Sequence, residues 1–262
     1  MTDPILIIQA SIIRLLHFFT RRKIVLIACM PKSGSTYLTS QLKNLAGFAD
    51  IPFVPSYDRR EQELSGSRIF WLCLLLPHKN LVAQHHVRCS KNTLDLIRWF
   101  DIKTIILTRN VEDIILSACD HLTNESTASP MSFWTEELLK NAEDAGQTRF
   151  SLLFRTMGPW LVNFYLTWKY LAPQLPEKLK PIYLKYEEFY ADEKSNFELL
   201  CSRLQLRNLR SYSLSKDSKT RFNKGQVGRG TAELSKDVLA SKVWQDLQTC
   251  YPSVCFNEPI AA

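Results

Sequence analysis

The chain has 262 residues, of which 45% are hydrophobic, and this length and composition are typical of one globular domain with an ordinary core. Its net charge of +7 favours an anionic partner, either nucleic acid, an anionic lipid surface or a polyanionic small molecule. The basic residues are scattered and no nucleic-acid-binding motif occurs, so we expect no nucleic-acid partner. The sequence leaves the oligomeric state open.

The cysteines indicate a reducing compartment. There are seven, an odd number, and none forms a C-x-x-C pair or a Cys/His spacing typical of zinc, so we expect no metal. Cys29, Cys73 and Cys119 stand in apolar runs, where thiols usually serve as small core residues. We therefore predict a cytoplasmic protein.

The N-terminal stretch from Ile5 to Phe19 is apolar but is interrupted by Gln9, Arg14 and His17. It is too short and too polar for a transmembrane span, and it lacks the flanks of a signal peptide. We expect an amphipathic helix that packs on the rest of the chain, so that residues 1–22 belong to the same domain as residues 23–262. Loose contact with a membrane surface is the alternative.

Strand-like and helix-like stretches alternate along the chain, which predicts an α/β fold with a parallel sheet. Buried strands are expected at 24–30, 80–87, 102–108 and 181–186. Helices are expected at 37–45, 62–76, 91–100, 111–122, 133–145, 160–171, 194–204 and 232–247, with Ser90 capping the third of these. No apolar period marks 51–60, 123–132 or 211–230.

A polar turn of sequence PKSGST follows the first strand and precedes the first helix after it. A small-residue loop between a strand and a helix start is a typical phosphate site, because backbone N–H groups and the helix dipole point at the anion. Lys32 adds a charge, Gly34 allows a tight turn, and Ser33, Ser35 and Thr36 add hydroxyls. In the nucleoside-triphosphate loop, by contrast, the lysine follows the second glycine. A metabolite kinase that uses ATP and Mg²⁺ is therefore the less favoured alternative.

Pro31 to Thr36 resemble the loop with which sulfotransferases hold 3′-phosphoadenosine 5′-phosphosulfate (PAPS), whose pattern is P-K-S-G-[ST]-[ST]. With the segments described below, the resemblance extends over residues 23–230. It implies a three-layer, P-loop-like α/β domain with a central parallel sheet flanked by helices. It also implies transfer of a sulfuryl group from PAPS to a hydroxyl or amine, with release of 3′-phosphoadenosine 5′-phosphate (PAP) and without a metal.

Two segments resemble those that bind the 3′-phosphate in this family. Arg109 follows the strand at 102–108 and Ser117 stands eight residues later, which is the family's spacing for an arginine and a serine that share the phosphate. The second segment is RFNKGQVGRG, in which Lys224, Gly225 and Gly228 match the family's R-K-G-x-x-G.

One position departs from that pattern, because Asn223 stands where the family usually has an arginine. Either Arg221 or Arg229 would then supply the missing charge, and the sequence does not decide between them. For the adenine, the resemblance points to Tyr186 in YLKYEEF and to Tyr37 directly after the loop.

An acceptor hydroxyl needs a base, and a neutral histidine within hydrogen-bond reach is the usual one. In the family this histidine ends the strand before the 3′-phosphate strand, where this sequence has His85 and His86. Because side chains alternate along a strand, only one of the two can face the cleft, and we favour His86. Lys32 would stabilise the charge that grows on the leaving phosphate oxygen.

The acceptor itself is the least determined part. We expect its pocket to come from 51–77 and 122–168, and we expect a small molecule because no membrane anchor is recognised. A glycan acceptor is the alternative within the family. A catalytically silent nucleotide-binding protein of the same fold is an alternative of another class.

Overall fold

The computed structural model describes residues 4–20, 22–44, 48–54, 63–124, 136–206 and 227–251. The chain divides into two compact units, Met1–Thr108 with Thr167–Thr220 and Ile260–Ala262, and Arg109–Leu166 with Arg221–Pro259. No helix in the described part of the chain is long and apolar enough to cross a membrane.

The first unit is built on one parallel sheet of five strands in the order β2-β3-β1-β4-β5. The strands are β1 Ile24–Cys29, β2 Phe48–Asp50, β3 Asn80–His85, β4 Lys103–Thr108 and β5 Ile182–Lys185. The helices are α1 Pro4–Thr20, α2 Ser35–Asn44, α3 Gly66–Leu75, α4 Lys91–Phe100, α8 Tyr186–Ala191 and α9 Glu193–Arg203. Two short 3₁₀ turns, Ala172–Gln174 and Glu177–Leu179, precede β5.

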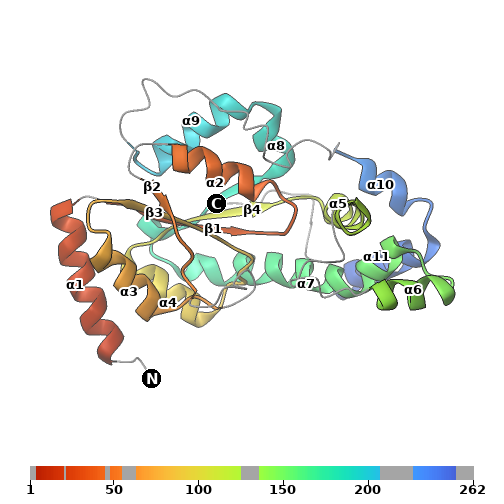
Figure 1. Ribbon diagram of the computed structural model, residues 1–262, viewed down its shortest axis with the longest axis horizontal. Helices are drawn as coiled ribbons and strands as arrows, with labels where there is room; N and C mark the ends of the chain where they lie inside the picture. The colour runs from red at the N-terminus through yellow and green to blue at the C-terminus, as the bar shows by residue number, and fades with distance from the viewer. Residues whose placement is uncertain are drawn as a thin grey trace. The chain divides into compact units, whose positions relative to one another are not determined.

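The sheet has a helical layer on each face. Helices α2, α8 and α9 cover one face, and α1, α3 and α4 lie on the other (Figure 1). Every residue of β1 is buried, as expected for a central parallel strand. Val25, Ile27 and Cys29 alternate into the core under α2, α8 and α9, together with Phe197 and Leu200 of α9. The predicted three-layer α/β fold with a parallel sheet is therefore confirmed.

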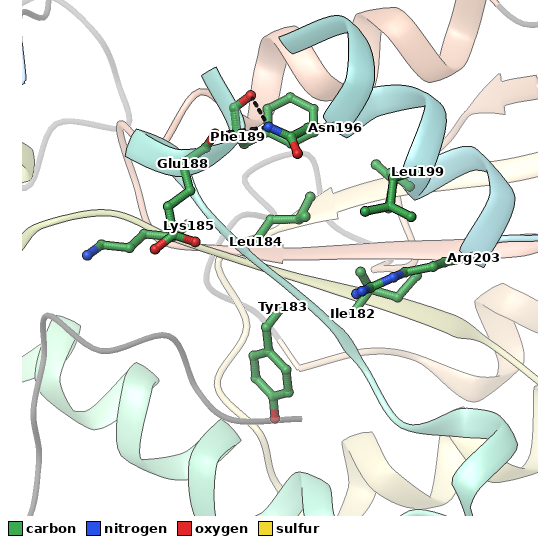
Figure 2. A pocket seen from close by; sticks show the side chains of 10 residues that line it. Ile182, Tyr183, Leu184, Lys185, Glu188, Phe189, Asn196, Leu199 and Arg203 are labelled. Atoms are coloured by element: carbon green, nitrogen blue, oxygen red, sulfur yellow. Dashed lines mark hydrogen bonds between the residues drawn. The ribbon is translucent and has the colours of Figure 1, made fainter. Parts of the chain in front are cut away.

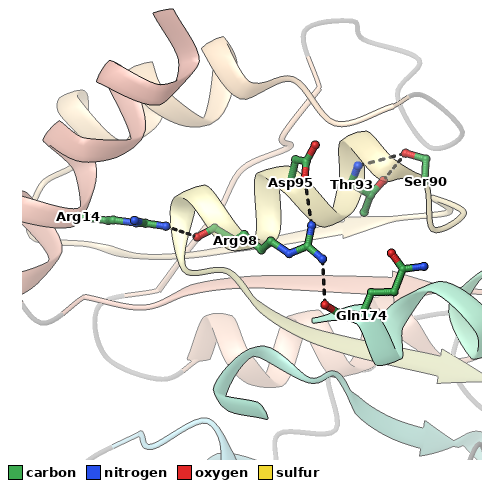
Figure 3. A network of polar contacts seen from close by, with 6 residues as sticks. All are labelled: Arg14, Ser90, Thr93, Asp95, Arg98 and Gln174. Atoms are coloured by element: carbon green, nitrogen blue, oxygen red, sulfur yellow. Dashed lines mark hydrogen bonds and ion pairs between the residues drawn. The ribbon is translucent and has the colours of Figure 1, made fainter. Parts of the chain in front are cut away.

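Helix α1 packs against α3 and α4. The guanidinium Nη2 of Arg14 donates to the carbonyl of Arg98 near the end of α4 at 2.8 Å. Arg98 in turn pairs with Asp95 and donates to the carbonyl of Gln174 (Figure 3). The hydroxyl of Ser90 accepts from the Thr93 N–H, which confirms the predicted cap of α4.

The second unit is helical. It contains α5 Val111–Asn124, α6 Glu136–Asp144, α10 Arg229–Leu234, α11 Val238–Cys250 and most of α7 Arg149–Leu171, whose residues from Thr167 on belong to the first unit. Its apolar contacts include an edge-to-face pair between Phe154 of α7 and Trp244 of α11. Helix α10 packs on α5.

Several sequence predictions need correction. The strand predicted to run to Val87 ends at His85, and the one predicted to run to Tyr186 ends at Lys185, where α8 begins. The helix predicted from Trp160 begins at Arg149, because Pro159 is accommodated inside it. The single helix predicted for 232–247 is two helices separated at Ser235–Asp237, and the short strand β2 was not predicted. The predicted loop at 123–132 lies mostly outside the described residues.

Candidate active site

The PKSGST turn connects the buried strand β1 to α2, which begins at Ser35. Two of its residues are in the left-handed region, Lys32 with φ 56° and Gly34 with φ 79°. The buried hydroxyl of Ser33 donates to the carbonyl of Met30 at 2.5 Å and so closes the turn. Left-handed residues within a turn orient neighbouring backbone N–H groups around a concavity, and the first N–H groups of a helix lack acceptors within it. The turn therefore has the backbone geometry of an anion site.

Gly34 is held by a tyrosine of α8 that the sequence prediction missed. The hydroxyl of Tyr190 donates to the Gly34 carbonyl at 2.9 Å. A Cβ at position 34 would lie 2.7 Å from the Tyr190 hydroxyl and 2.9 Å from a ring carbon of Tyr186. The left-handed φ and this contact both demand glycine here. The spacing of Tyr186 and Tyr190, one helical turn apart, was the available signal, but it went unused because Tyr186 was assigned to a strand.

The three tyrosines near the loop form a cluster. The rings of Tyr186 and Tyr190 lie 4.5 Å apart between centroids, and those of Tyr37 and Tyr190 lie 5.8 Å apart. Tyr37 and Tyr186 are both buried. The structure thus brings together the two residues that were predicted to contact adenine, and it places both beside the PKSGST turn.

The two histidines at the end of β3 have different hydrogen-bond partners. The Nε2 of His85 accepts the Phe53 N–H at 3.0 Å, and the side chain is fully buried. The Nδ1 of His86 lies 2.9 Å from the Cys29 carbonyl, and because a carbonyl can only accept, this nitrogen donates. A neutral His86 ring in this tautomer carries its lone pair on Nε2, and the lone pair of a neutral His85 accepts the Phe53 N–H. The Sγ of Cys29 also lies 3.4 Å from Nδ1 of His86. His86 is 7% exposed whereas His85 is fully buried, so His86 stays the favoured candidate for a base.

The segment after β3 is fixed by α7. The indole N–H of Trp168 donates to the Val87 carbonyl at 3.0 Å, and the Thr167 hydroxyl accepts the Cys89 N–H at 3.2 Å. His86 is thus held from two sides, by the end of β1 through its ring and by α7 through the following backbone.

The loop and His86 lie at the edge of the sheet where the central strands end. Ala28 pairs with His85 and Cys29 pairs with Leu107, so β1, β3 and β4 end side by side. The connection after β1 runs to the side of the sheet that holds β2 and β3, and the connection after β4 runs to the opposite side, where β5 lies. In open α/β sheets, ligands bind outside the carboxyl ends of the strands at the point where such connections diverge.

A pocket beside the edge strand β5 does not contain the predicted site residues. It lies between β5 and helices α8 and α9, where Tyr183, Lys185 and Arg203 are among the lining residues (Figure 2). Asn196 donates to the carbonyls of Glu188 and Phe189 and so ties α9 to α8. We interpret this pocket as a surface hollow at an edge strand.

Two residues predicted for the 3′-phosphate lie in the second unit. Arg109 is buried (6% exposed) and directly follows β4, two residues before α5 begins. Ser117 is half-buried in α5. Arg109 stands at the end of the strand and Ser117 in the following helix, as predicted for the two segments, and their joint role at a phosphate stays a prediction.

The glycine-rich segment is described only from Val227 on, and Arg221, Lys224 and Gly225 lie outside the described residues. Gly228 has φ 86° and caps α10. Its N–H donates to a carboxylate oxygen of Asp113 at 3.0 Å. Arg229 lies 3.5 Å from a carboxylate oxygen of Asp120. Gly228 thus meets α5 through its N–H, and Arg229 is engaged by an acid of the same helix.

The described cysteines and the possible metal ligands are the remaining reactive groups. All six described cysteines are free, and burial raises the pKa of Cys73 to about 11 and that of Cys89, Cys119 and Cys201 to about 12. In the described part of the chain, no group of three or more His, Cys, Asp or Glu side chains could hold a metal ion.

Comparison with known proteins supports the fold. The crystal structure of mouse sulfotransferase SULT7A1 complexed with PAP is similar to this chain, with a TM-score of 0.59 and 18% sequence identity over 90% of this chain and 88% of that one. No family model matches the chain, and no curated protein sequence matches it. The chain therefore has the sulfotransferase fold, which the loop motif had predicted.

Proposed function

We propose that the protein transfers a sulfuryl group from PAPS to a hydroxyl or amine of a small-molecule acceptor and releases PAP. The single observation that carries this proposal is the PKSGST turn at the end of the central strand, with His86 directly after the adjacent strand β3 and its Nδ1 at 2.9 Å from the Cys29 carbonyl. The PAP in the similar mouse structure supports the choice of nucleotide.

PAPS supplies an activated sulfuryl group on a phosphate leaving group. In this proposal Nε2 of His86 takes the proton of the acceptor hydroxyl while the acceptor oxygen forms its bond to sulfur. The bond between sulfur and the bridging phosphate oxygen breaks in line, and the negative charge remains on the phosphate. The Lys32 ammonium and the N–H groups of the turn stabilise that charge without a metal ion.

The donation from His86 Nδ1 to the Cys29 carbonyl supports this role in two ways. It sets the tautomer that leaves Nε2 basic, and it stabilises the imidazolium that forms when the proton arrives, since the protonated ring still donates from Nδ1. His85 remains a structural residue in this proposal, because its Nε2 accepts from the backbone of Phe53.

The remaining nucleotide contacts follow the sequence prediction. Tyr37 and Tyr186 would contact the adenine, and the clustering of both around Tyr190 beside Gly34 supports this assignment. Arg109 and Ser117 would bind the 3′-phosphate, because guanidinium and hydroxyl groups donate to phosphate oxygens. The assignments of Arg221, Lys224 and Gly225 stay predictions, and so does a cytoplasmic location.

Calorimetry with PAP and with ATP plus Mg²⁺ separates this proposal from a kinase. We expect heat of binding with PAP and none with ATP and Mg²⁺. Transfer of labelled sulfate from PAPS to a panel of phenols, alcohols and amines then separates an enzyme from a silent binding protein.

Lys32→Ala should lower transfer about 100-fold or more, since it removes the positive charge that would stabilise the leaving group. Lys43→Ala is the matched control, because Lys43 lies in the last turn of α2, the helix that follows the PKSGST turn, in an exposed ion pair with Asp50. Absence of PAP binding by folded protein would overturn the proposal.

A further inference from the structure

Asp113 of α5 binds the backbone of Gly228 and Gly230, which lie 115 and 117 residues later in the sequence. Its side chain is 2% exposed. One carboxylate oxygen accepts the N–H of Gly228 at 3.0 Å, and the other accepts the N–H of Gly230 at 2.8 Å. The first turn of α5 is therefore bound to the first turn of α10 through a single carboxylate.

The close approach of the two backbones makes this junction specific. A Cβ on Gly230 would lie 2.2 Å from the carbonyl carbon of Glu112 and 2.4 Å from the N–H nitrogen of Asp113. Only glycine fits there, because both neighbouring atoms are backbone. The distance between α5 and α10 is thus fixed at Gly230 by contact and at Gly228 by a hydrogen bond.

A carboxylate suits this position better than any neutral side chain. Two N–H groups require two acceptors, and the ionised carboxylate is the one side-chain group of this size that accepts at both ends. A buried charge also needs compensation, which the two N–H groups and the positive end of the α10 dipole provide. Asparagine would turn an NH₂ group toward one of the two donors.

We propose that Asp113 is a positioning residue for the 3′-phosphate of the nucleotide, an inference that rests on the proposed function. Asp113 follows Arg109 by four residues, and Gly228 is the last matching glycine of the segment that resembles the family's other 3′-phosphate element. The carboxylate holds the backbone at Gly228 and Gly230 against the first turn of α5. It touches neither the phosphate nor the acceptor in this proposal, and acts only through the backbone that it binds.

The test compares nucleotides that differ only in the 3′-phosphate. Calorimetry gives the Kd of PAP and of adenosine 5′-monophosphate (AMP) for the wild type, for Asp113→Asn and for Asp120→Asn. Loss of hydrogen bonds to a charged group predicts PAP binding about 10- to 100-fold weaker in Asp113→Asn, with AMP binding changed less than about threefold. Asp120→Asn is the matched control, since this exposed acid of the same helix contacts Arg229 of α10, and PAP binding should stay within about threefold.

A second measurement needs no variant. If the contact of Asp113 with the two glycine N–H groups raises the affinity for PAP by some factor, bound PAP must favour the formed contact by the same factor. The reason is that coupling between two sites is reciprocal. Amide hydrogen exchange at Gly228 and Gly230 in the wild type should therefore be about tenfold slower with saturating PAP than with saturating AMP.

Each possible result of these measurements either supports or overturns the inference. Equal weakening of PAP and AMP in Asp113→Asn would show a general structural role and overturn the inference. Unchanged PAP binding in the folded variant, or equal exchange under the two nucleotides, would overturn it too. A wild type that binds PAP no better than AMP would instead overturn the proposed function.

Discussion

The two units hold their candidate residues by different means. In the first unit, the loop and His86 stand at the ends of neighbouring strands whose hydrogen-bonded register fixes them. In the second, Arg109, Ser117 and Gly228 belong to a helical assembly whose α5 and α10 are joined by Asp113. A sheet edge positions groups through many backbone bonds shared among strands, whereas the contact between α5 and α10 combines two hydrogen bonds of Asp113, the Arg229–Asp120 ion pair and the close approach at Gly230. Single substitutions should therefore act locally in the first unit and on the whole α5–α10 pair in the second.

The largest effect is expected at His86. His86→Ala should lower transfer about 100- to 10,000-fold, because it removes the proposed base, while PAP binding stays within a few-fold. His85→Gln should retain most of the turnover but lower the melting temperature, since it replaces a buried acceptor of the Phe53 N–H. Rates and PAP titrations for both variants distinguish the two roles. Normal turnover of His86→Ala would make His85 the next candidate.

Gly230→Ala tests the helical junction by contact alone. The added methyl group would meet the Glu112 and Asp113 backbone at 2.2–2.4 Å, so we expect a loss of roughly 1–3 kcal/mol of stability or separation of α10 from α5. Denaturant unfolding measures the change. Gly146→Ala provides the control in the same unit, because its left-handed φ of 73° comes with no atom within 4 Å of the new methyl group. A loss no larger than that of Gly146→Ala would contradict the tight approach.

Gly34→Ala would introduce both backbone strain at a left-handed φ and a steric contact with neighbouring side chains in the first unit. The left-handed φ costs about 1–2 kcal/mol, and the new methyl group would meet Tyr190 and Tyr186. Because these neighbours are side chains that can move, we expect a smaller loss of stability than for Gly230→Ala but a distinct loss of PAP affinity. Calorimetry and thermal unfolding measure the two quantities separately. Unchanged PAP affinity would argue against this loop as the anion site.

Tyr190→Phe removes the hydrogen bond to Gly34 and leaves the ring contacts in place. Such a bond contributes about 1 kcal/mol, so PAP affinity should fall about fivefold if the bond shapes the loop. Tyr183→Phe is the control, because its hydroxyl donates to the Trp168 carbonyl at 3.5 Å and not to Gly34. Equal effects of both substitutions would show that Tyr190 has no special connection to the loop.

The smallest effect concerns the buried thiols, which occur in both units. Burial raises their pKa to about 11 or 12, so the folded protein holds protons that the unfolded chain releases near pH 9. Stability from this source is complete below about pH 8.5 and decreases as the pH rises toward 11 to 12. Thiol labelling at pH 9 should then spare Cys73, Cys89, Cys119 and Cys201 while it modifies the exposed Cys250. Rapid labelling of Cys119 alone would indicate that the second unit is the looser one.

Local patterns in the sequence were sufficient for much of the first unit. The apolar runs at Ile24 and Ile102 predicted β1 and β4 to within two residues, and Ser90 predicted the start of α4. The PKSGST turn was recognisable because strand, small-residue loop and helix start are contiguous. Its residues depend on neighbours only a few positions away, and such dependence is visible in a sequence.

Only the tertiary structure decided which atoms each of these residues meets. The tautomer of His86 depends on a carbonyl of β1 that is 57 residues away, and the need for glycine at position 34 depends on Tyr190, 156 residues further on. Asp113 lies in the first turn of α5, yet its carboxylate binds the start of another helix, α10. Long-range contacts arise from packing, and no local period or motif in one sequence encodes which partner a buried polar group will find.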